Sequence, residues 1–140
     1  INLLPDNPLR GPNDEQYGNR FPDMSAPYDK TMQQQAIEIA QRVGVKAHRV
    51  VYVSTPGPNL ETRAEYRYMR IIGGDIVGMS TVPEVIVANH MHLPVFAISV
   101  VTDEGFHADL KPVSLQEIVK VAAEIEPKMT QVLKELIALQ

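Results

Sequence analysis

The chain has 140 residues, no cysteine, no tryptophan and a formal net charge of −4 at pH 7. The lack of cysteine excludes disulfides and thiolate metal sites, and the mild acidity, without a basic stripe, argues against a nucleic-acid partner. Because no apolar run approaches the ~20 residues of a membrane span, we expect one soluble domain, residues 1–140, in the cytoplasm and with no membrane partner.

The first 24 residues are rich in proline and glycine, so they cannot hold regular structure for long. We expect an extended, turn-rich segment whose polar side chains fix its own turns by hydrogen bonds. The side chains in question are Arg10, Asn13, Asp14 and Arg20.

A helix is predicted over residues 27–43, because its apolar residues recur at helical spacing. Ser25 is the expected N-cap and Gly44 the expected end.

A β-branched strand is predicted at 50–54, followed by Thr-Pro-Gly-Pro, through which neither a strand nor a helix can continue. Asn59 is then the expected cap of a helix over 60–72, which places Glu61 in the first turn. From the residues alone, the simplest role for Glu61 is to balance the helix dipole.

The central stretch, residues 73–84, predicts a short strand at 76–78 and a helix over 82–92 with Thr81 as its cap. Ser80 lies between them, at the carboxyl end of a strand and at a helix N-terminus. Sheets of α/β proteins place their ligands at this position, so we expect a site for a small, polar and anionic group. His90 and His92, at the end of the helix, are two residues apart and face different sides, so we expect no metal there.

The apolar run at 93–101 predicts a strand buried on both faces of a parallel sheet. A long helix is predicted over 114–139, with Ser114 as cap and a kink or break at Pro127. The alternation of strands and helices predicts an α/β fold around a mostly parallel or mixed sheet, with polar groups along its carboxyl edge.

Three segments resemble motifs of the trimeric purine nucleoside phosphorylases, in that family's order and spacing: Asn-Pro-Leu-Arg-Gly-Pro-Asn-Asp at 7–14, Gly-Pro-Asn-Leu-Glu-Thr at 57–62, and Gly-Met-Ser-Thr-Val-Pro-Glu at 78–84. The resemblance implies a homotrimer that splits inosine or guanosine with inorganic phosphate and uses no metal or organic cofactor. It covers residues 1–137 and corresponds to the C-terminal half of a family member. An alternative interpretation is therefore that this chain alone is a non-catalytic fragment that lacks a complete phosphate site.

The resemblance also implies roles for individual residues. The carboxylate of Glu61 would accept from N1–H of a 6-oxopurine, and the hydroxyl of Ser80 would donate to phosphate, together with backbone amides. The other implied substrate contacts are Leu60 and Val77 on the purine faces, Met79 beneath the ribose, and Tyr52 near the sugar, where a core tyrosine is an equally good interpretation.

Three features depart from the family pattern. The first two are typical of the related methylthioadenosine phosphorylases, and the third differs from the mammalian members. Asp103 stands where asparagine is usual, Leu115 where many members carry a histidine for the ribose 5′-hydroxyl, and the early loop has no aromatic before Tyr17. We favour the nucleoside phosphorylases, because Glu61 and Ser80 match them and not the methylthioadenosine enzymes.

Asp103 is expected either to hold a proton and donate it to N7 of the departing purine as a general acid, or to turn away from the purine and bond a backbone amide. If ionised, it would instead accept from the 6-amino group of adenine. The structural alternative is an Asx turn that closes the loop after the strand.

Overall fold

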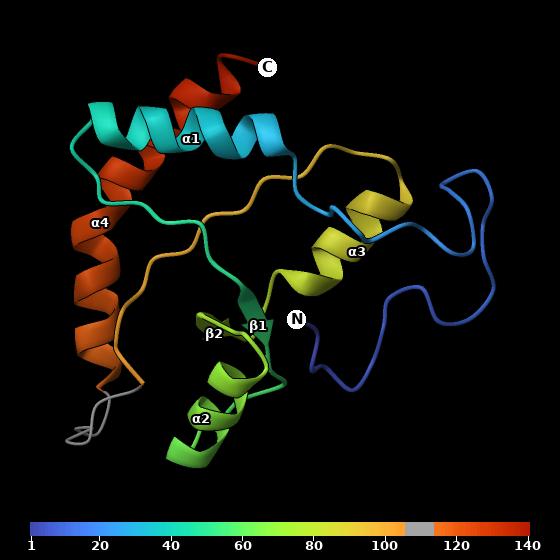
Figure 1. Cartoon of the computed structure of the whole chain (residues 1–140), viewed down its shortest axis with the longest axis horizontal. Coiled ribbons are helices and arrows are strands. Elements are labelled where there is room, and N and C mark those ends of the chain that lie inside the picture. Colours follow the sequence, from blue (N-terminus) through green and yellow to red (C-terminus); the bar gives the residue numbers. More distant parts are fainter. Residues whose placement is uncertain (106–113) are drawn as a thin grey trace. The chain divides into compact units, whose positions relative to one another are not determined.

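The computed structural model describes residues 1–105 and 114–140 (Figure 1). Its helices and strands are, in chain order, α1 Lys30–Arg42, β1 Tyr52–Ser54, α2 Arg63–Ile71, β2 Ile76–Gly78, α3 Val82–His90 and α4 Leu115–Ile137. The chain divides into two compact units, residues 1–29 with 50–97, and residues 30–49 with 98–140. The alternating order of parallel strands and helices confirms the α/β class.

The first unit is built on a parallel pair of strands. β1 and β2 lie side by side (Figure 1), with Tyr52 opposite Ile76, Val53 opposite Val77 and Ser54 opposite Gly78. The first residues of the chain pair with the other edge of β1 through an isolated parallel bridge between Asn2 and Ser54. Neighbours on both sides leave Val53 and Ser54 fully buried, which makes β1 the centre of this unit.

Helix α2 begins at Arg63, not at residue 60, and its N-cap is Thr62, not Asn59. Thr62 and Glu65 form a capping box, because the Thr62 hydroxyl accepts from the Glu65 amide and the Glu65 carboxylate accepts from the Thr62 amide. These bonds to Thr62 hold the pKa of Glu65 below its usual value. The side-chain amide of Asn59 instead donates to the Leu60 carbonyl. Because the helix begins after Thr62, Glu61 precedes it and does not lie in its first turn.

Asp75 ties α2 to the two strands. One carboxylate oxygen accepts from the Val51 amide at 2.8 Å, and the other pairs with Arg70 in the last turn of α2. The bond from Val51 and then the bond from Arg70 lower the pKa of Asp75. This carboxylate therefore joins the start of β1, the start of β2 and the end of α2.

Helix α3 packs its first two turns into the first unit through Val85 and Ile86, both buried as expected. At its other end His90 is also buried, with Nε2 3.0 Å from Oδ1 of Asn13. His90 therefore anchors the N-terminal segment to the last turn of α3.

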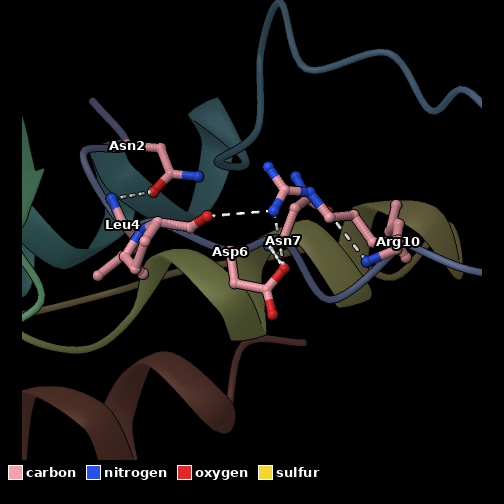
Figure 2. Close-up of polar contacts among 7 residues, drawn as sticks. Asn2, Leu4, Asp6, Asn7 and Arg10 are labelled. Atoms are coloured by element: carbon pink, nitrogen blue, oxygen red, sulfur yellow. Dashed lines mark hydrogen bonds and ion pairs between the residues drawn. The ribbon is translucent and has the colours of Figure 1, made fainter.

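The N-terminal segment is held by its own side chains, as the sequence predicted. Figure 2 shows Arg10 beside Asp6, whose exposed carboxylate lies 3.2 Å from the guanidinium. The Arg10 guanidinium also donates to the Pro5 carbonyl at 3.1 Å. Asn13 donates to the Gly18 carbonyl, and Asp14 accepts from the Gln16 amide. Arg20 donates to the carbonyls of Leu9 and Gly11, both at 2.8 Å.

The second unit pairs α1 with α4, and the two helices cross in Figure 1. Their buried residues are Ala36, Ile39, Ala40, Val132 and Leu136. Gly44 ends α1 as predicted: it adopts φ 71°, and the Val45 amide closes onto the Ala40 carbonyl at 2.8 Å. The predicted cap is wrong, since α1 begins at Lys30 and the Ser25 hydroxyl donates to Asp23 at 2.7 Å.

Helix α4 continues through Pro127, although its ribbon changes direction partway along its length in Figure 1. The predicted kink is thus present in the ribbon, and the predicted break is not. Ser114 is the N-cap residue but makes no side-chain capping bond among the described residues.

The strand predicted at 93–101 is wrong, because the described structure assigns no strand there. A β-strand requires a hydrogen-bonded neighbouring strand. In the described chain, the backbone bonds of this run join the Leu93 amide to the Ala88 carbonyl in α3 and the Val95 carbonyl to the Asp29 amide, which precedes a helix. Leu93 and Val101 are more than half exposed, so the two ends of this apolar run lie at the surface of the described chain. Across residues 1–105 and 114–140, none of the helices combines the length and the apolar character that crossing a bilayer requires.

Candidate functional site

Six of the eight predicted site residues lie in the first unit, on or just after the two parallel strands. Tyr52 belongs to β1 and Val77 to β2. Leu60 and Glu61 lie in the loop between β1 and α2, and Met79 and Ser80 in the turn between β2 and α3. The carboxyl ends of β1 and β2 therefore bring the two predicted loops to one edge of the strand pair.

Two residues of β1 hold the backbone of Ser80. The Ser80 amide donates to the Tyr52 hydroxyl at 3.3 Å, and the buried Ser54 hydroxyl donates to the Ser80 carbonyl at 3.2 Å. Since the backbone N–H and C=O of Ser80 are both hydrogen-bonded to the strand, β1 fixes the backbone position from which its exposed side chain extends.

The turn that follows is a strained γ-turn centred on Thr81. Thr81 has φ 75° and ψ −53°, and the Val82 amide closes the turn onto the Ser80 carbonyl at 2.8 Å. A positive φ is a rare conformation for a β-branched residue, and such residues cluster at functional sites. The predicted capping position of Thr81 is confirmed, but its hydroxyl makes no capping bond and lies 3.2 Å from the Ser80 hydroxyl.

Two of the backbone amides at this turn are already hydrogen-bonded. The Ser80 amide is bound to Tyr52 and the Val82 amide to the Ser80 carbonyl. An anion at this turn would therefore meet the Ser80 hydroxyl and not these two N–H groups.

Tyr52 lies over β2, which explains why Gly78 follows Val77. A Cβ added at Gly78 would meet the Tyr52 hydroxyl at 2.2 Å, so the ring fits only above a residue without a side chain. Partial burial and then the neighbouring Tyr52 raise the pKa of Tyr28.

Met79 lies against the other loop. A Cβ added at Gly57, which has φ 58°, would meet the Met79 sulfur at 2.3 Å. Met79 is 41% exposed and Leu60 is 47% exposed, so both present apolar surface beside the two loops.

Glu61 is half-buried, and its Oε1 accepts from the Thr55 hydroxyl at 2.7 Å. A cavity of about 220 Å³ is lined by Leu3, by the loop after β1 and by residues of α2, and Glu61 and Glu65 are among the lining residues. Tyr52, Val77, Met79 and Ser80 do not line this cavity. Glu61 therefore lies between the cavity and the strand edge.

The remaining two predicted residues, Asp103 and Leu115, belong to the second unit. Asp103 is exposed, and its Oδ1 accepts from the Thr102 hydroxyl at 2.8 Å. Leu115, the first residue of α4, is 74% exposed. Their roles stay predictions, as do those of the six residues in the first unit.

Comparison with known proteins identifies the family. The family model described as "Phosphorylase superfamily" matches residues 1–138. Purine nucleoside phosphorylase 1 of Bacillus subtilis is 41% identical over 99% of this chain and 51% of its own length. Purine nucleoside phosphorylase of Mus musculus is 44% identical over 95% of this chain and 48% of its own length. The chain belongs to the purine nucleoside phosphorylase family. Its resemblance to this family, read from three short motifs, is confirmed.

Solved purine nucleoside phosphorylases share the fold. The Schistosoma enzyme in complex with hypoxanthine superposes with a TM-score of 0.86 at 38% identity, over 92% of this chain and 48% of the other. The Schistosoma mansoni enzyme in complex with inosine gives the same TM-score over 47% of its chain. The chain thus spans about half the length of the relatives it matches.

Sequence reasoning missed Ser54 and Thr55, the hydroxyls that bind Ser80 and Glu61 in this family member. Ser54 ends the predicted strand and Thr55 opens the Thr-Pro-Gly-Pro stretch, and neither local pattern indicates which groups the two hydroxyls would bind. The capping box at Thr62 could have been found, because Thr62 and Glu65 have the same spacing as Thr81 and Glu84.

The strain at Thr81 predicts the order of stability of two variants. Thr81→Gly and Thr81→Val both remove the hydroxyl, but glycine adopts φ 75° freely and valine does not. We expect Thr81→Gly to unfold at higher denaturant concentration than Thr81→Val, by about 1 kcal/mol in the free energy of unfolding. At Thr130, inside α4, the same pair should show the opposite order, because glycine destabilises a helix interior. Equal stability of the two Thr81 variants would contradict a strained turn.

Proposed function

We propose that the full-length protein containing this chain is a cytoplasmic purine nucleoside phosphorylase, which converts inosine or guanosine and inorganic phosphate to the purine base and ribose 1-phosphate. The proposal rests on one observation: a carboxylate held by a hydrogen bond, Glu61, and an exposed hydroxyl, Ser80, lie in the loops that follow two adjacent parallel strands. Family membership and the inosine, guanosine and hypoxanthine named for the Schistosoma structures support it.

The reaction explains why these groups are needed. A phosphate oxygen attacks C1′ of the ribose as the N-glycosidic bond breaks, and the bonding electrons flow into the purine ring. In our proposal Glu61 accepts from N1–H and, with guanine, from the 2-amino group. Ser80 donates to phosphate, and its backbone bonds to β1 keep that donor in place without rearrangement during the reaction.

Apolar contacts supply the rest of the proposed substrate site. Leu60 and Val77 flank the purine, Met79 lies beneath the ribose and Tyr52 lies near the sugar. The exposed surfaces of Met79 and Leu60 suit such contacts, because both side chains present apolar surface in the described chain. Leu115 is proposed for the ribose 5′ end.

A second candidate activity is phosphorolysis of methylthioadenosine, which Asp103 and Leu115 favour. We place it second, because a half-buried carboxylate at Glu61 matches the N1–H donor of a 6-oxopurine and repels the unprotonated N1 of a 6-aminopurine.

The substrate test compares inosine, guanosine and methylthioadenosine, each with phosphate, using the full-length protein. We expect kcat/KM for inosine and guanosine to exceed that for methylthioadenosine. Glu61→Ala should lower kcat/KM for inosine by roughly 100-fold, since a site built around a substrate N–H loses that recognition. A preference for methylthioadenosine would replace the first proposal with the second.

Asp103 is proposed to act on the purine ring, as a protonated donor to N7 or as an ionised acceptor for a 6-amino group. In the full-length protein we expect Asp103→Asn to change the pH dependence of inosine cleavage in the first case and to abolish adenosine cleavage in the second. Kinetics that match the wild type with both nucleosides would leave Asp103 a structural role, in which it accepts from Thr102.

We also propose that the full-length protein is a homotrimer, with the N-terminal segment near the subunit interface. Phe21 in this segment is 87% exposed and Tyr17 is 56% exposed, and a neighbouring subunit would cover such aromatic surface. Sedimentation velocity at micromolar concentration should therefore give three times the mass of one chain. A monodisperse monomer would contradict the proposal.

A further inference from the structure

Thr55 is the first residue after β1, and it contacts both of the loops that carry the proposed site. Its amide donates to the Gly78 carbonyl at 2.9 Å, which fixes Thr55 to the end of β2. Its hydroxyl lies 2.7 Å from Oε1 of Glu61 and 3.4 Å from the Gly78 carbonyl oxygen. A threonine hydroxyl has one hydrogen to donate, and the shorter contact to a charged acceptor takes it.

The loop between Thr55 and Glu61 has little regular structure to orient a carboxylate. Two prolines and a glycine with φ 58° occupy it, and Glu61 itself precedes the capping box of α2. The hydrogen bond from Thr55 therefore fixes the Glu61 side chain to the strand pair and not only to its own loop. It also occupies one lone pair of Oε1, so that the other acceptor positions of the carboxylate are left for a ligand.

We infer that Thr55 is a positioning residue for base recognition, which holds the Glu61 carboxylate in the orientation that accepts the purine N1–H. This inference rests on the proposed function. It gives Thr55 no contact with the substrate, and it makes selectivity for 6-oxopurines depend on a hydroxyl at the end of β1. A purely structural role, in which the same bond only closes the loop, would affect every nucleoside alike.

The test uses the full-length protein with Thr55→Val, which keeps the shape of the side chain, Thr55→Ala, which removes the hydroxyl with less bulk, and Thr55→Ser, which restores it. Thr130→Val is the matched control, because the Thr130 hydroxyl also binds a carboxylate, Oε1 of Glu126 at 2.6 Å, but on α4 and outside the proposed site. Steady-state rates are measured with inosine and with purine riboside, which has the same ribose but no N1–H. The KM for phosphate and the thermal midpoint are measured for each variant.

We expect Thr55→Val and Thr55→Ala to lower kcat/KM for inosine by roughly 10-fold, the usual effect of losing a hydrogen bond to a charged group. The loss should arise mainly from a higher KM for inosine, while purine riboside and the KM for phosphate change less than about twofold. Thr55→Ser should recover most of the inosine activity, and Thr130→Val should match the wild type.

Two results would overturn the role of Thr55 while leaving the proposed function intact: inosine kinetics unchanged in the variants that lack the hydroxyl, or equal losses with inosine and purine riboside. A wild-type protein that fails to cleave inosine would overturn the proposed function, and the role of Thr55 with it. If Thr55→Val lowers the thermal midpoint so far that it does not fold, the comparison of Thr55→Ala with Thr55→Ser decides the question.

Discussion

Two hydrogen bonds from β1 hold the backbone of Ser80, one to the Tyr52 hydroxyl and one from the buried Ser54 hydroxyl. Both depend on the parallel register, which sets Ser54 opposite Gly78 and so brings the end of β1 beside the turn that follows β2. A slip of one residue would turn Tyr52 and Ser54 to the opposite faces of the strand. The register of three residue pairs therefore decides where the Ser80 side chain lies.

The same register also positions the loop between β1 and α2. Thr55 continues β1 by one residue, and its amide reaches the Gly78 carbonyl at the end of β2. Its hydroxyl then holds Glu61, six residues further along the chain. The carboxylate and the hydroxyl of the proposed site thus derive their positions from one short strand, although they come from different loops. The hydroxyls of Tyr52, Ser54 and Thr55, and not the helix N-terminus alone, hold these groups in position.

Periodicity and turn residues predicted α1, α2, α3, α4, β1 and β2 to within a few residues, and three motifs predicted the loops in which the candidate site lies. What they could not predict was the choice among competing hydrogen bonds. Ser25 binds Asp23 and does not cap α1, and Thr62 caps α2 where Asn59 was expected. Thr81 has the spacing of a capping box but a positive φ. The strand expected at 93–101 needed a partner strand, which lies outside what a local pattern can specify.

Gly57 and Met79 restrict each other's evolution. A side chain at position 57 would strike the flexible end of Met79, and the positive φ of Gly57 would still penalise most residues after Met79 had been shortened. At Gly78 the conflict is with the Tyr52 hydroxyl. Phenylalanine at 52 would remove the hydroxyl but leave ring carbon Cζ 2.9 Å from that Cβ, and the Ser80 amide would lose its acceptor. A change at Met79 or Tyr52 alone should therefore not make a substitution at either glycine neutral, which closes the simplest two-step route by which a lineage could replace these glycines.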